Sequence, residues 1–230
     1  MTMRYAIIVA GGKGTRMGTD VPKQFLPIGG RPVLMRTIER FRQFDAQMRL
    51  IVVLPAEQQD YWRRLCAQYH FSVGHQLACG GATRFESSRN GLALIPKDAG
   101  GMVAIHDGAR PFVSVETIGR CFAKAEEMGG AIPVLPVTDT LRRKTTDGES
   151  ETVNRSLYCR VQTPQVFDIQ RIKAAYAQPY RPEYTDDASV YEFSGDNKVG
   201  LVDGNTENIK LTTPLDLLTG EALLRKDAAV

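Results

Sequence analysis

The sequence is poor in the residues that define several common classes of protein. Its 230 residues include only four cysteines and three histidines. The cysteines are far apart and form no Cys-x-x-Cys pair: they are Cys66, Cys79, Cys121 and Cys159. Zinc sites and disulfide frameworks depend on characteristic cysteine spacings, so this pattern argues against both and predicts free thiols in a reducing compartment.

Long apolar runs and clusters of like charge are also missing. No apolar run approaches the length of about 20 residues that crosses a bilayer. The opening Met-Thr-Met-Arg leads directly into a short apolar run, which does not fit a signal peptide. The net charge of +3 is modest, and the basic residues form no run of the kind that binds nucleic acid. We therefore expect a cytoplasmic protein with no membrane or nucleic-acid partner, whose cations bind a small anion.

The loop after the first apolar run lacks two common phosphate-binding patterns. A P-loop needs a lysine followed by Ser or Thr, but Lys13 is followed by Gly14. The dinucleotide fingerprint needs a third glycine where Met17 stands, and the next strand-like run ends at Pro55 without an acidic residue. These absences argue against a P-loop NTPase and a dehydrogenase.

The same loop nevertheless has the composition of a phosphate site. Residues 5–9 are apolar and predict a buried strand, and a glycine-rich segment follows at once. Glycines let the backbone approach a ligand and direct N–H groups into a concavity that suits an anion. Three cations, Lys13, Arg16 and Lys23, accompany them. A turn that binds nothing is the alternative, and these cations disfavour it.

Strand-like and helix-like segments alternate along the chain. This alternation predicts a single α/β domain over residues 1–230, with a Rossmann-like, mostly parallel sheet and helices on both faces. Further strands are expected at 50–54, 75–79, 102–106 and 131–137, with a final pair at 199–202 and 209–211. Helices are expected at 32–44, 56–70, 83–94, 115–128, 168–178 and 214–224, with one more beginning at Thr185 or Asp186.

Residues 137–160 interrupt the alternation with a polar stretch. Asp147-Gly148 is typical of a hairpin turn, and the flanks at 138–145 and 151–158 hold too few apolar residues to form a core. A mobile surface hairpin is one interpretation. The other is a projecting arm that packs on a second copy in a homodimer, the commonest closed oligomer.

Motifs spread along the whole chain accompany the glycine loop. They are Gly80-Gly81-x-x-Arg84, His106-Asp107-Gly-Ala-Arg110-Pro111, Thr163-Pro164-Gln165, Thr185-Asp-Asp-Ala-Ser189 and Asn208-Ile-Lys210-Leu-Thr212. Most follow predicted strands, whose carboxyl ends are where open α/β sheets bind ligands. This convergence predicts a site at one edge of the sheet.

In order and spacing these motifs, with Gly11-Gly-x-Gly-Thr-Arg16-Met-Gly and Pro22-Lys23-Gln, resemble the 2-C-methyl-D-erythritol 4-phosphate cytidylyltransferases of isoprenoid biosynthesis. The sequence departs from that pattern in two places. It reads Ala10-Gly11-Gly12 where a second alanine is more common, and Ala82 replaces an acidic residue.

The resemblance implies that a phosphate oxygen of methylerythritol phosphate attacks the α-phosphorus of CTP and expels pyrophosphate. Catalytic roles fall to Arg16, Lys23 and Lys210. Nucleotide contacts fall to Ala10, Gly11, Gly12, Lys13, Gly14, Gly80, Gly81, Arg84 and Ser87. Substrate contacts fall to Asp107, Arg110, Thr163 and Thr185, and to Thr140 and Arg155 from the arm of the second subunit.

The expected cofactor is Mg²⁺, which prefers phosphates and a few carboxylates. Asp107 is the best carboxylate candidate for a metal ligand, although the resemblance gives it a substrate hydroxyl. His106 fits a hydrogen-bonded strand-end histidine better than a general base, since a phosphate nucleophile is already deprotonated. Asp186 and Asp187 fit metal ligation by spacing, but acidic residues also favour helix N-termini.

Two other functions remain open at this stage. A ribitol 5-phosphate cytidylyltransferase would share the first loop, and Thr185 favours methylerythritol phosphate over that substrate. A nucleotide-binding module without catalysis would tend to lose its cations, whereas Arg16, Lys23 and Lys210 are all present.

Overall fold

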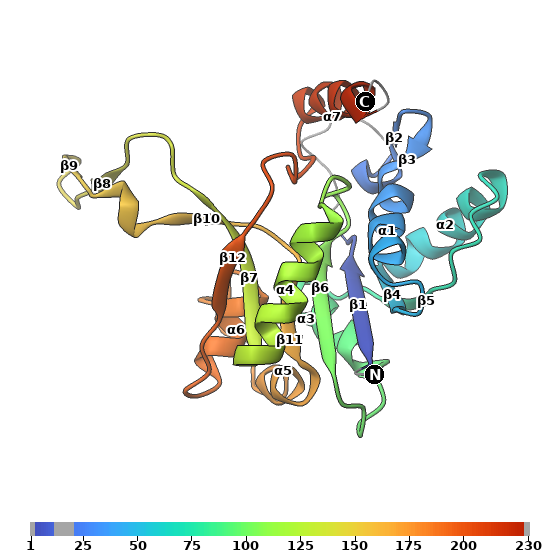
Figure 1. Cartoon of the computed structure of the whole chain (residues 1–230), viewed down its shortest axis with the longest axis horizontal. Helices are drawn as coiled ribbons and strands as arrows, with labels where there is room; N and C mark the ends of the chain where they lie inside the picture. Colours follow the sequence, from blue (N-terminus) through green and yellow to red (C-terminus); the bar gives the residue numbers. More distant parts are fainter. Residues whose placement is uncertain (1–2, 12–20, 228–230) are drawn as a thin grey trace.

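The central sheet of the computed structural model, which describes residues 3–11 and 21–227, is built outward from β1 (Arg4–Val9) (Figure 1). Ala6, Ile7 and Ile8 are fully buried, as expected for a parallel strand covered on both faces. β1 pairs in parallel with β4 (Arg49–Leu54) on one side and β6 (Met102–Asp107) on the other. Along the sheet the order is β10 (Cys159–Val161), β7 (Gly130–Pro136), β11 (Gln165–Asp168), β6, β1, β4 and β5 (Gln76–Cys79), and β12 (Gly200–Asp203) pairs with β7.

The strands of this sheet agree with most of the predicted runs. The parallel half consists of β1, β4 (Arg49–Leu54), β5 (Gln76–Cys79) and β6 (Met102–Asp107). The other half consists of β7 (Gly130–Pro136), β10 (Cys159–Val161), β11 (Gln165–Asp168) and β12 (Gly200–Asp203). There β10 and β11 run antiparallel to β7, while β12 runs parallel to it. The predicted mostly parallel sheet is confirmed.

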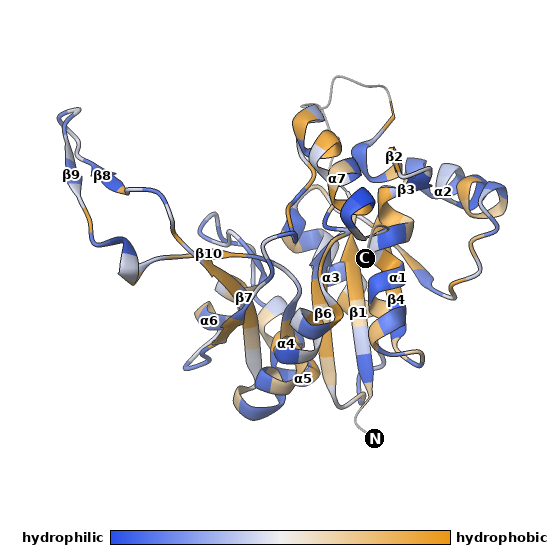
Figure 2. Ribbon diagram, turned by 45° about the horizontal axis from the view of Figure 1, so that its top comes forward, coloured by the Kyte–Doolittle hydropathy of each residue, from blue (hydrophilic) through white to orange (hydrophobic). Residues whose placement is uncertain are grey.

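Helices cover both faces of the sheet, as the alternation predicted. One face packs α1 (Val33–Phe44), α2 (Ala56–Gln68) and α4 (Val115–Met128) against strand residues such as Ala6 and Ile8. The opposite face packs α3 (Arg84–Ala93), α5 (Ile169–Tyr176) and α6 (Asp187–Phe193) against Tyr5 and Ile7. The apolar colouring of the central strands in Figure 2 follows from this double coverage.

Local signals explain where several helices begin and end. Thr83 caps α3 in a capping box with Glu86. Gly129 ends α4 with φ 85°, a left-handed conformation that glycine tolerates. Asp168 caps α5, and Asp186 rather than Thr185 caps α6. These caps account for helix starts predicted within one residue.

The prediction of a strand at residues 209–211, the second of the final pair, is wrong. Residues 209–211 form no strand, because this segment is tied to the loop after β6 and not to β12. Leu211 N–H donates to the Ala109 carbonyl at 2.9 Å. The Arg110 Nη1 donates to the Asn208 carbonyl at 2.9 Å. The closing helix α7 (Pro214–Asp227) follows and packs over Ile28, Phe112 and Leu211.

Short elements complete the chain. Near the sheet edge lie η2 (Lys23–Phe25), β2 (Pro27–Ile28) and β3 (Arg31–Pro32). Between β7 and β10 the chain leaves the body as the hairpin β8 (Arg142–Lys144) and β9 (Ser150–Thr152), followed by η3 (Arg155–Leu157). This arm projects away from the sheet in Figure 1, and its strands are shorter than predicted and exposed. Among the helices of the described chain, none combines the length and apolarity that a membrane crossing requires.

Gly91 in α3 tests the packing of this helix on the sheet. A Cβ at this position would lie 2.6 Å from Ile7 Cγ2 and 3.1 Å from Val53 Cγ2. We expect Gly91→Ala to lower the free energy of unfolding by about 1–3 kcal/mol through overpacking, despite the better helix propensity of alanine. Urea denaturation measures the change. Gly119→Ala is the control, because its Cβ meets only Phe44 Cε2, at 3.3 Å. A Gly91→Ala protein as stable as the control would contradict the prediction.

Candidate active site

A cavity opens where β1, β5 and β6 end, at the edge that the sequence motifs predicted. Its lining is Val9, Ala10, Gly11, Lys23, Gln24, Gly81, Ala82, Thr83, Arg84, Ser87, Asp107, Gly108, Ala109 and Lys210. The carboxyl ends of three parallel strands, the start of α3 and the segment after β12 therefore meet at one place. Eight of the predicted site residues line it: Ala10, Gly11, Lys23, Gly81, Arg84, Ser87, Asp107 and Lys210.

The other predicted residues fall into three groups. Gly12, Lys13, Gly14 and Arg16 lie outside the described residues. Gly80, Arg110 and Thr163 do not line the cavity but adjoin residues that do: Gly80 precedes Gly81, and Arg110 and Thr163 contact Asp107. Thr140, Arg155 and Thr185 are exposed, the first two on the arm and the third before α6.

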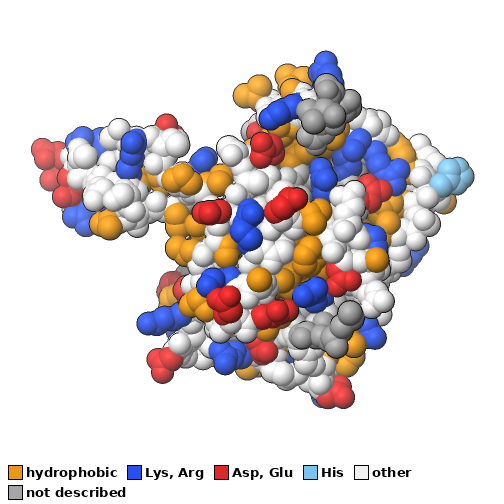
Figure 3. All heavy atoms as spheres, viewed as in Figure 1, with side chains coloured by type: hydrophobic (Ala, Val, Ile, Leu, Met, Phe, Trp, Pro, Cys, Tyr) orange, Lys and Arg blue, Asp and Glu red, His pale blue; other side chains and the backbone are white. Residues whose placement is uncertain are grey.

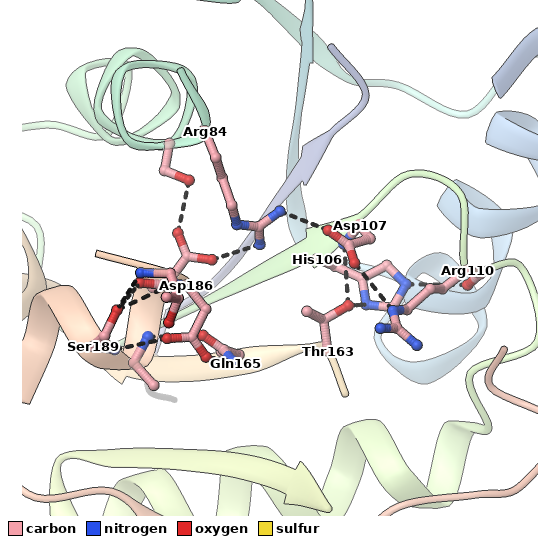
Figure 4. Close-up of polar contacts among 12 residues, drawn as sticks. Arg84, His106, Asp107, Arg110, Thr163, Gln165, Asp186 and Ser189 are labelled. Carbon is pink, nitrogen blue, oxygen red and sulfur yellow. Dashed lines mark hydrogen bonds and ion pairs between the residues drawn. The ribbon is translucent and has the colours of Figure 1, made fainter. Parts of the chain in front are cut away.

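Asp107 is the electrostatic centre of the cavity. Its Oδ1 accepts from Arg84 Nη1 at 2.6 Å, and its Oδ2 lies 3.1 Å from Arg110 Nε (Figure 4). The same Oδ2 lies 3.0 Å from Lys210 Nζ. Its side chain is only 8% exposed. Burial alone would raise the pKa of Asp107, but the three cations hold that pKa well below its usual value. The carboxylate is therefore ionised at any physiological pH.

This arrangement does not fit the metal-ligand role predicted for Asp107. Both carboxylate oxygens already face cationic groups, which would repel a divalent ion placed beside them. No group of three or more His, Cys, Asp or Glu side chains suited to a metal occurs within residues 3–11 and 21–227. The cluster instead suits an anionic or hydroxylic ligand.

Arg84 links Asp107 to a second carboxylate, that of Asp187. Its Nη2 donates to Asp187 Oδ2 at 2.6 Å, while its Nη1 holds Asp107. Burial alone would lower the pKa of Arg84, and the two carboxylates raise it above its ordinary value. Each terminal nitrogen thus already donates to a carboxylate, which the predicted nucleotide-binding role of Arg84 did not anticipate.

His106, near the end of β6, has a hydrogen-bond partner for each nitrogen of its ring. Its Nε2 lies 3.1 Å from the Arg110 carbonyl, so that nitrogen carries the proton. Its Nδ1 then accepts from the Thr163 hydroxyl at 2.9 Å, and the same hydroxyl accepts from the Asp107 N–H. Burial lowers the pKa of His106 to about 3. A neutral imidazole with both nitrogens engaged orients Thr163 and does not act as a base.

The glycine pair after β5 is held by the start of α3. Ser87 Oγ donates to the Thr83 carbonyl at 2.9 Å and accepts from the Gly81 N–H at 3.1 Å. A Cβ on Gly81 would lie 2.3 Å from the Cβ of Glu86, so only glycine fits there. The Ala82 N–H donates to Glu86 Oε2 at 2.6 Å. The carboxylate nearest this turn is therefore Glu86, which is committed to capping α3.

Sequence reasoning missed several buried polar residues around the cavity. Gln24 is buried, and its Nε2 donates to the Ala10 carbonyl at 2.8 Å, which ties η2 to the end of β1. Asn208 Nδ2 donates to the Thr163 carbonyl at 2.8 Å. Both residues belong to motifs that were noted for a neighbouring lysine. Their place in those motifs was the signal that the sequence offered.

A Rossmann-like sheet whose strand ends carry a glycine-lined, cation-rich cavity defines an α/β protein of the nucleotidyltransferase class. The model of the 2-C-methyl-D-erythritol 4-phosphate cytidylyltransferase family (IspD) matches residues 4–226. The chain belongs to this family.

Individual relatives agree with this assignment. A protein of this name from Bacteroides thetaiotaomicron is 58% identical over 218 residues, covering 95% of this chain and 98% of its own. The crystal structure of 4-diphosphocytidyl-2C-methyl-D-erythritol synthase from Anaerococcus prevotii superposes with a TM-score of 0.83 at 29% identity, covering 97% of this chain and 96% of that one. The corresponding cytidylyltransferase from Thermus thermophilus gives a TM-score of 0.75 at 33% identity, covering 98% and 100%.

The depressed pKa of His106 predicts a pH-dependent stability. Its folded pKa of about 3 lies below the ordinary value of 6.5, so the unfolded chain binds a proton first as the pH falls. Stability from this residue is complete above about pH 6.5 and is lost toward pH 3, by up to about 1.4 kcal/mol per pH unit. We expect the stability difference between wild type and His106→Gln, measured by urea unfolding, to shrink from pH 7 to pH 5.

His75→Gln provides the matched control, since His75 is another hydrogen-bonded histidine, paired with Trp62 and Val73. A His106→Gln difference that stays constant from pH 7 to pH 5 would show that His106 titrates normally in the folded protein.

Proposed function

We propose that this chain transfers a cytidylyl group from CTP to 2-C-methyl-D-erythritol 4-phosphate. A phosphate oxygen of the polyol substrate forms a bond to the α-phosphorus of CTP, the bond from that phosphorus to the β-phosphate oxygen breaks, and pyrophosphate leaves. The product is 4-diphosphocytidyl-2-C-methyl-D-erythritol. The observation that carries the proposal is the Asp107 cluster beside the glycine-lined cavity: one buried carboxylate held by Arg84, Arg110 and Lys210.

The two parts of the cavity suit the two substrates. Backbone groups at Gly11 and Gly81 line the part expected to hold CTP. Asp107 offers acceptor oxygens to the hydroxyls of a polyol, and Lys210, which lines the cavity, offers a cation to its phosphate. Arg110 adds positive charge from behind Asp107. Catalysis then rests on bringing two polyanions into line and neutralising the charge that develops. Lys23 lines the cavity and, with Arg16 of the glycine loop, is the group proposed to stabilise the transition state.

Mg²⁺ enters this proposal as part of the CTP complex. Its preferred ligands are phosphate oxygens and water together with few protein groups. Asp107 does not fit as that protein group, because three cations already face it. We therefore assign the metal to the triphosphate and no step to a metal held by the protein.

The assay that tests the reaction measures pyrophosphate release from CTP and Mg²⁺ with methylerythritol 4-phosphate, and with ribitol 5-phosphate in parallel. We expect release only with the first substrate. Lys210→Ala should lower the rate by about 10²–10³-fold, because it removes one cation from the reacting phosphates. Lys198→Ala, at an exposed lysine, is the control. Release only with ribitol 5-phosphate would reassign the substrate, and no release with CTP still bound would favour a non-catalytic module.

We further propose that the arm completes the site of a second subunit in a homodimer. Large apolar side chains are exposed at the base of the arm and on the adjoining sheet: Leu157, Tyr158, Val161 and Leu201. Exposed apolar residues gathered in one region indicate an interaction surface. Figure 3 shows the arm standing clear of the body with apolar atoms at its root. Arg155 and Thr140, both exposed on this arm, would then reach the partner's cavity.

Mixing two inactive variants tests this shared site. Lys210→Ala damages the body of a site, and Arg155→Ala damages the arm that enters the partner's site. A mixed dimer of these variants holds one intact site, so random pairing should restore about a quarter of wild-type activity. Co-expression with two different tags provides the mixed dimers. Lys210→Ala mixed with Lys23→Ala is the control that should restore nothing, since both changes lie in the body. No recovery in the first mixture, with mixed dimers verified, would refute a shared site.

A further inference from the structure

We propose that Asp187 is a positioning residue: it fixes the guanidinium of Arg84, and through Arg84 it sets the orientation of the Asp107 carboxylate. The proposal rests on the proposed function, in which Asp107 receives the hydroxyls of the polyol substrate. Asp187 belongs to the motif Thr185-Asp-Asp-Ala-Ser189 and begins α6, on the face of the sheet that also carries α3.

Asp187 is a fully buried carboxylate with three side-chain donors. Its side chain is 0% exposed. Its Oδ1 accepts from the Ser88 hydroxyl at 2.7 Å and the Tyr176 hydroxyl at 2.6 Å. Its Oδ2 accepts from Arg84 Nη2 at 2.6 Å. A buried charge persists only when it is paired and hydrogen-bonded, so this position is built to hold an ion pair with Arg84.

The shape of the guanidinium transmits the position of one carboxylate to the other. Arg84 uses Nη2 for Asp187 and Nη1 for Asp107, both at 2.6 Å (Figure 4). Because a guanidinium is planar and rigid, fixing Nη2 also fixes the direction in which Nη1 points. Asp107 has two other cationic partners, Arg110 and Lys210, on its Oδ2. Arg84 is therefore the group that holds its Oδ1.

Asp187 is itself held in place by the sheet. Gln165, in β11, donates from Nε2 to Asp186 Oδ2 at 2.7 Å and accepts the Ala188 N–H at 2.8 Å. These two hydrogen bonds fix Asp186 and Ala188, the residues on either side of Asp187. The buried Thr163-Pro164-Gln165 motif thus positions α6, α6 positions Asp187, and Asp187 positions Arg84. These two motifs therefore act together on Asp107, a carboxylate far from both in the sequence.

Asp187→Asn is a selective test, because an asparagine Oδ1 can still accept from Ser88 and Tyr176. Its amide would turn an N–H toward the Arg84 N–H, so the ion pair and its hydrogen bond are lost while both bonds to Oδ1 are kept. We expect the KM for methylerythritol 4-phosphate to rise by about 100-fold, because a displaced Asp107 carboxylate no longer meets the substrate hydroxyls in the bound geometry. The Kd of CTP, measured by calorimetry, should stay near the wild-type value because the backbone groups of the nucleotide side are unchanged.

Two further variants separate positioning from mere structural support. Tyr176→Phe removes one hydrogen bond to Oδ1 and leaves the Arg84 pair, so it should lower stability without raising that KM. Arg84→Lys keeps a cation but cannot fork between two carboxylates, so it should reproduce the KM increase. It also serves as the test if Asp187→Asn does not fold. Equal KM effects in Tyr176→Phe and Asp187→Asn, or an unchanged KM in Arg84→Lys, would overturn the proposal.

A crystal structure of Asp187→Asn without substrates distinguishes failure of this inference from failure of the proposed function. We expect Arg84 Nη1 to leave Asp107 Oδ1 and the Asp107 side chain to rotate. That result would support the positioning role even if wild type used a different polyol phosphate. An unchanged Arg84–Asp107 pair would refute it, whatever substrate the wild-type enzyme accepts.

Discussion

One buried carboxylate, that of Asp107, organises the site and the parts of the chain around it. A charge that is 8% exposed must be compensated, and three cations supply that compensation: Arg110, three residues further along the chain, and the distant Arg84 and Lys210. Each cation belongs to a different segment of the chain: Arg84 to the start of α3, Arg110 to the loop after β6, and Lys210 to the segment after β12. The cavity exists at this edge because these segments converge on one acceptor.

The antiparallel half of the sheet makes this convergence possible. β11 enters the sheet beside β6 in the opposite direction, so the residues before it lie at the carboxyl end of β6. Thr163 therefore reaches the Asp107 N–H, and Asn208 binds the Thr163 carbonyl. A wholly parallel sheet would have placed that end of the strand at the opposite edge. The change in strand direction thus contributes the second wall of the site.

Sequence reasoning predicted the features that are encoded locally. Caps such as Thr83 predicted where helices begin, and apolar runs that end at glycine predicted strands. The position of the motifs at the ends of those strands predicted which edge of the sheet carries the cavity. Residues 209–211 were predicted as a strand, but the Leu211 N–H donates to Ala109, about 100 residues earlier, and the Ile209 N–H donates to the nearby Glu207 carbonyl. The pairing of Arg84 with both Asp107 and Asp187 spans 103 residues and has no local signature. Long-range pairs of this kind decide which charged motif residue is free to bind a ligand.

The cations around Asp107 differ in how readily they can change partner. Arg84 is held between two carboxylates with a side chain 29% exposed. Lys210 meets Asp107 through one flexible side chain that is 42% exposed. A compact ammonium on a flexible stem can move to an incoming phosphate, whereas a forked guanidinium held at both ends loses two charge-assisted bonds if it moves. In the proposed reaction, Asp107 would thus keep one fixed cation, Arg84, and release an exchangeable one, Lys210, to the substrate phosphate. Such a division would let the site be ordered before the substrate arrives and still supply a positive charge to it.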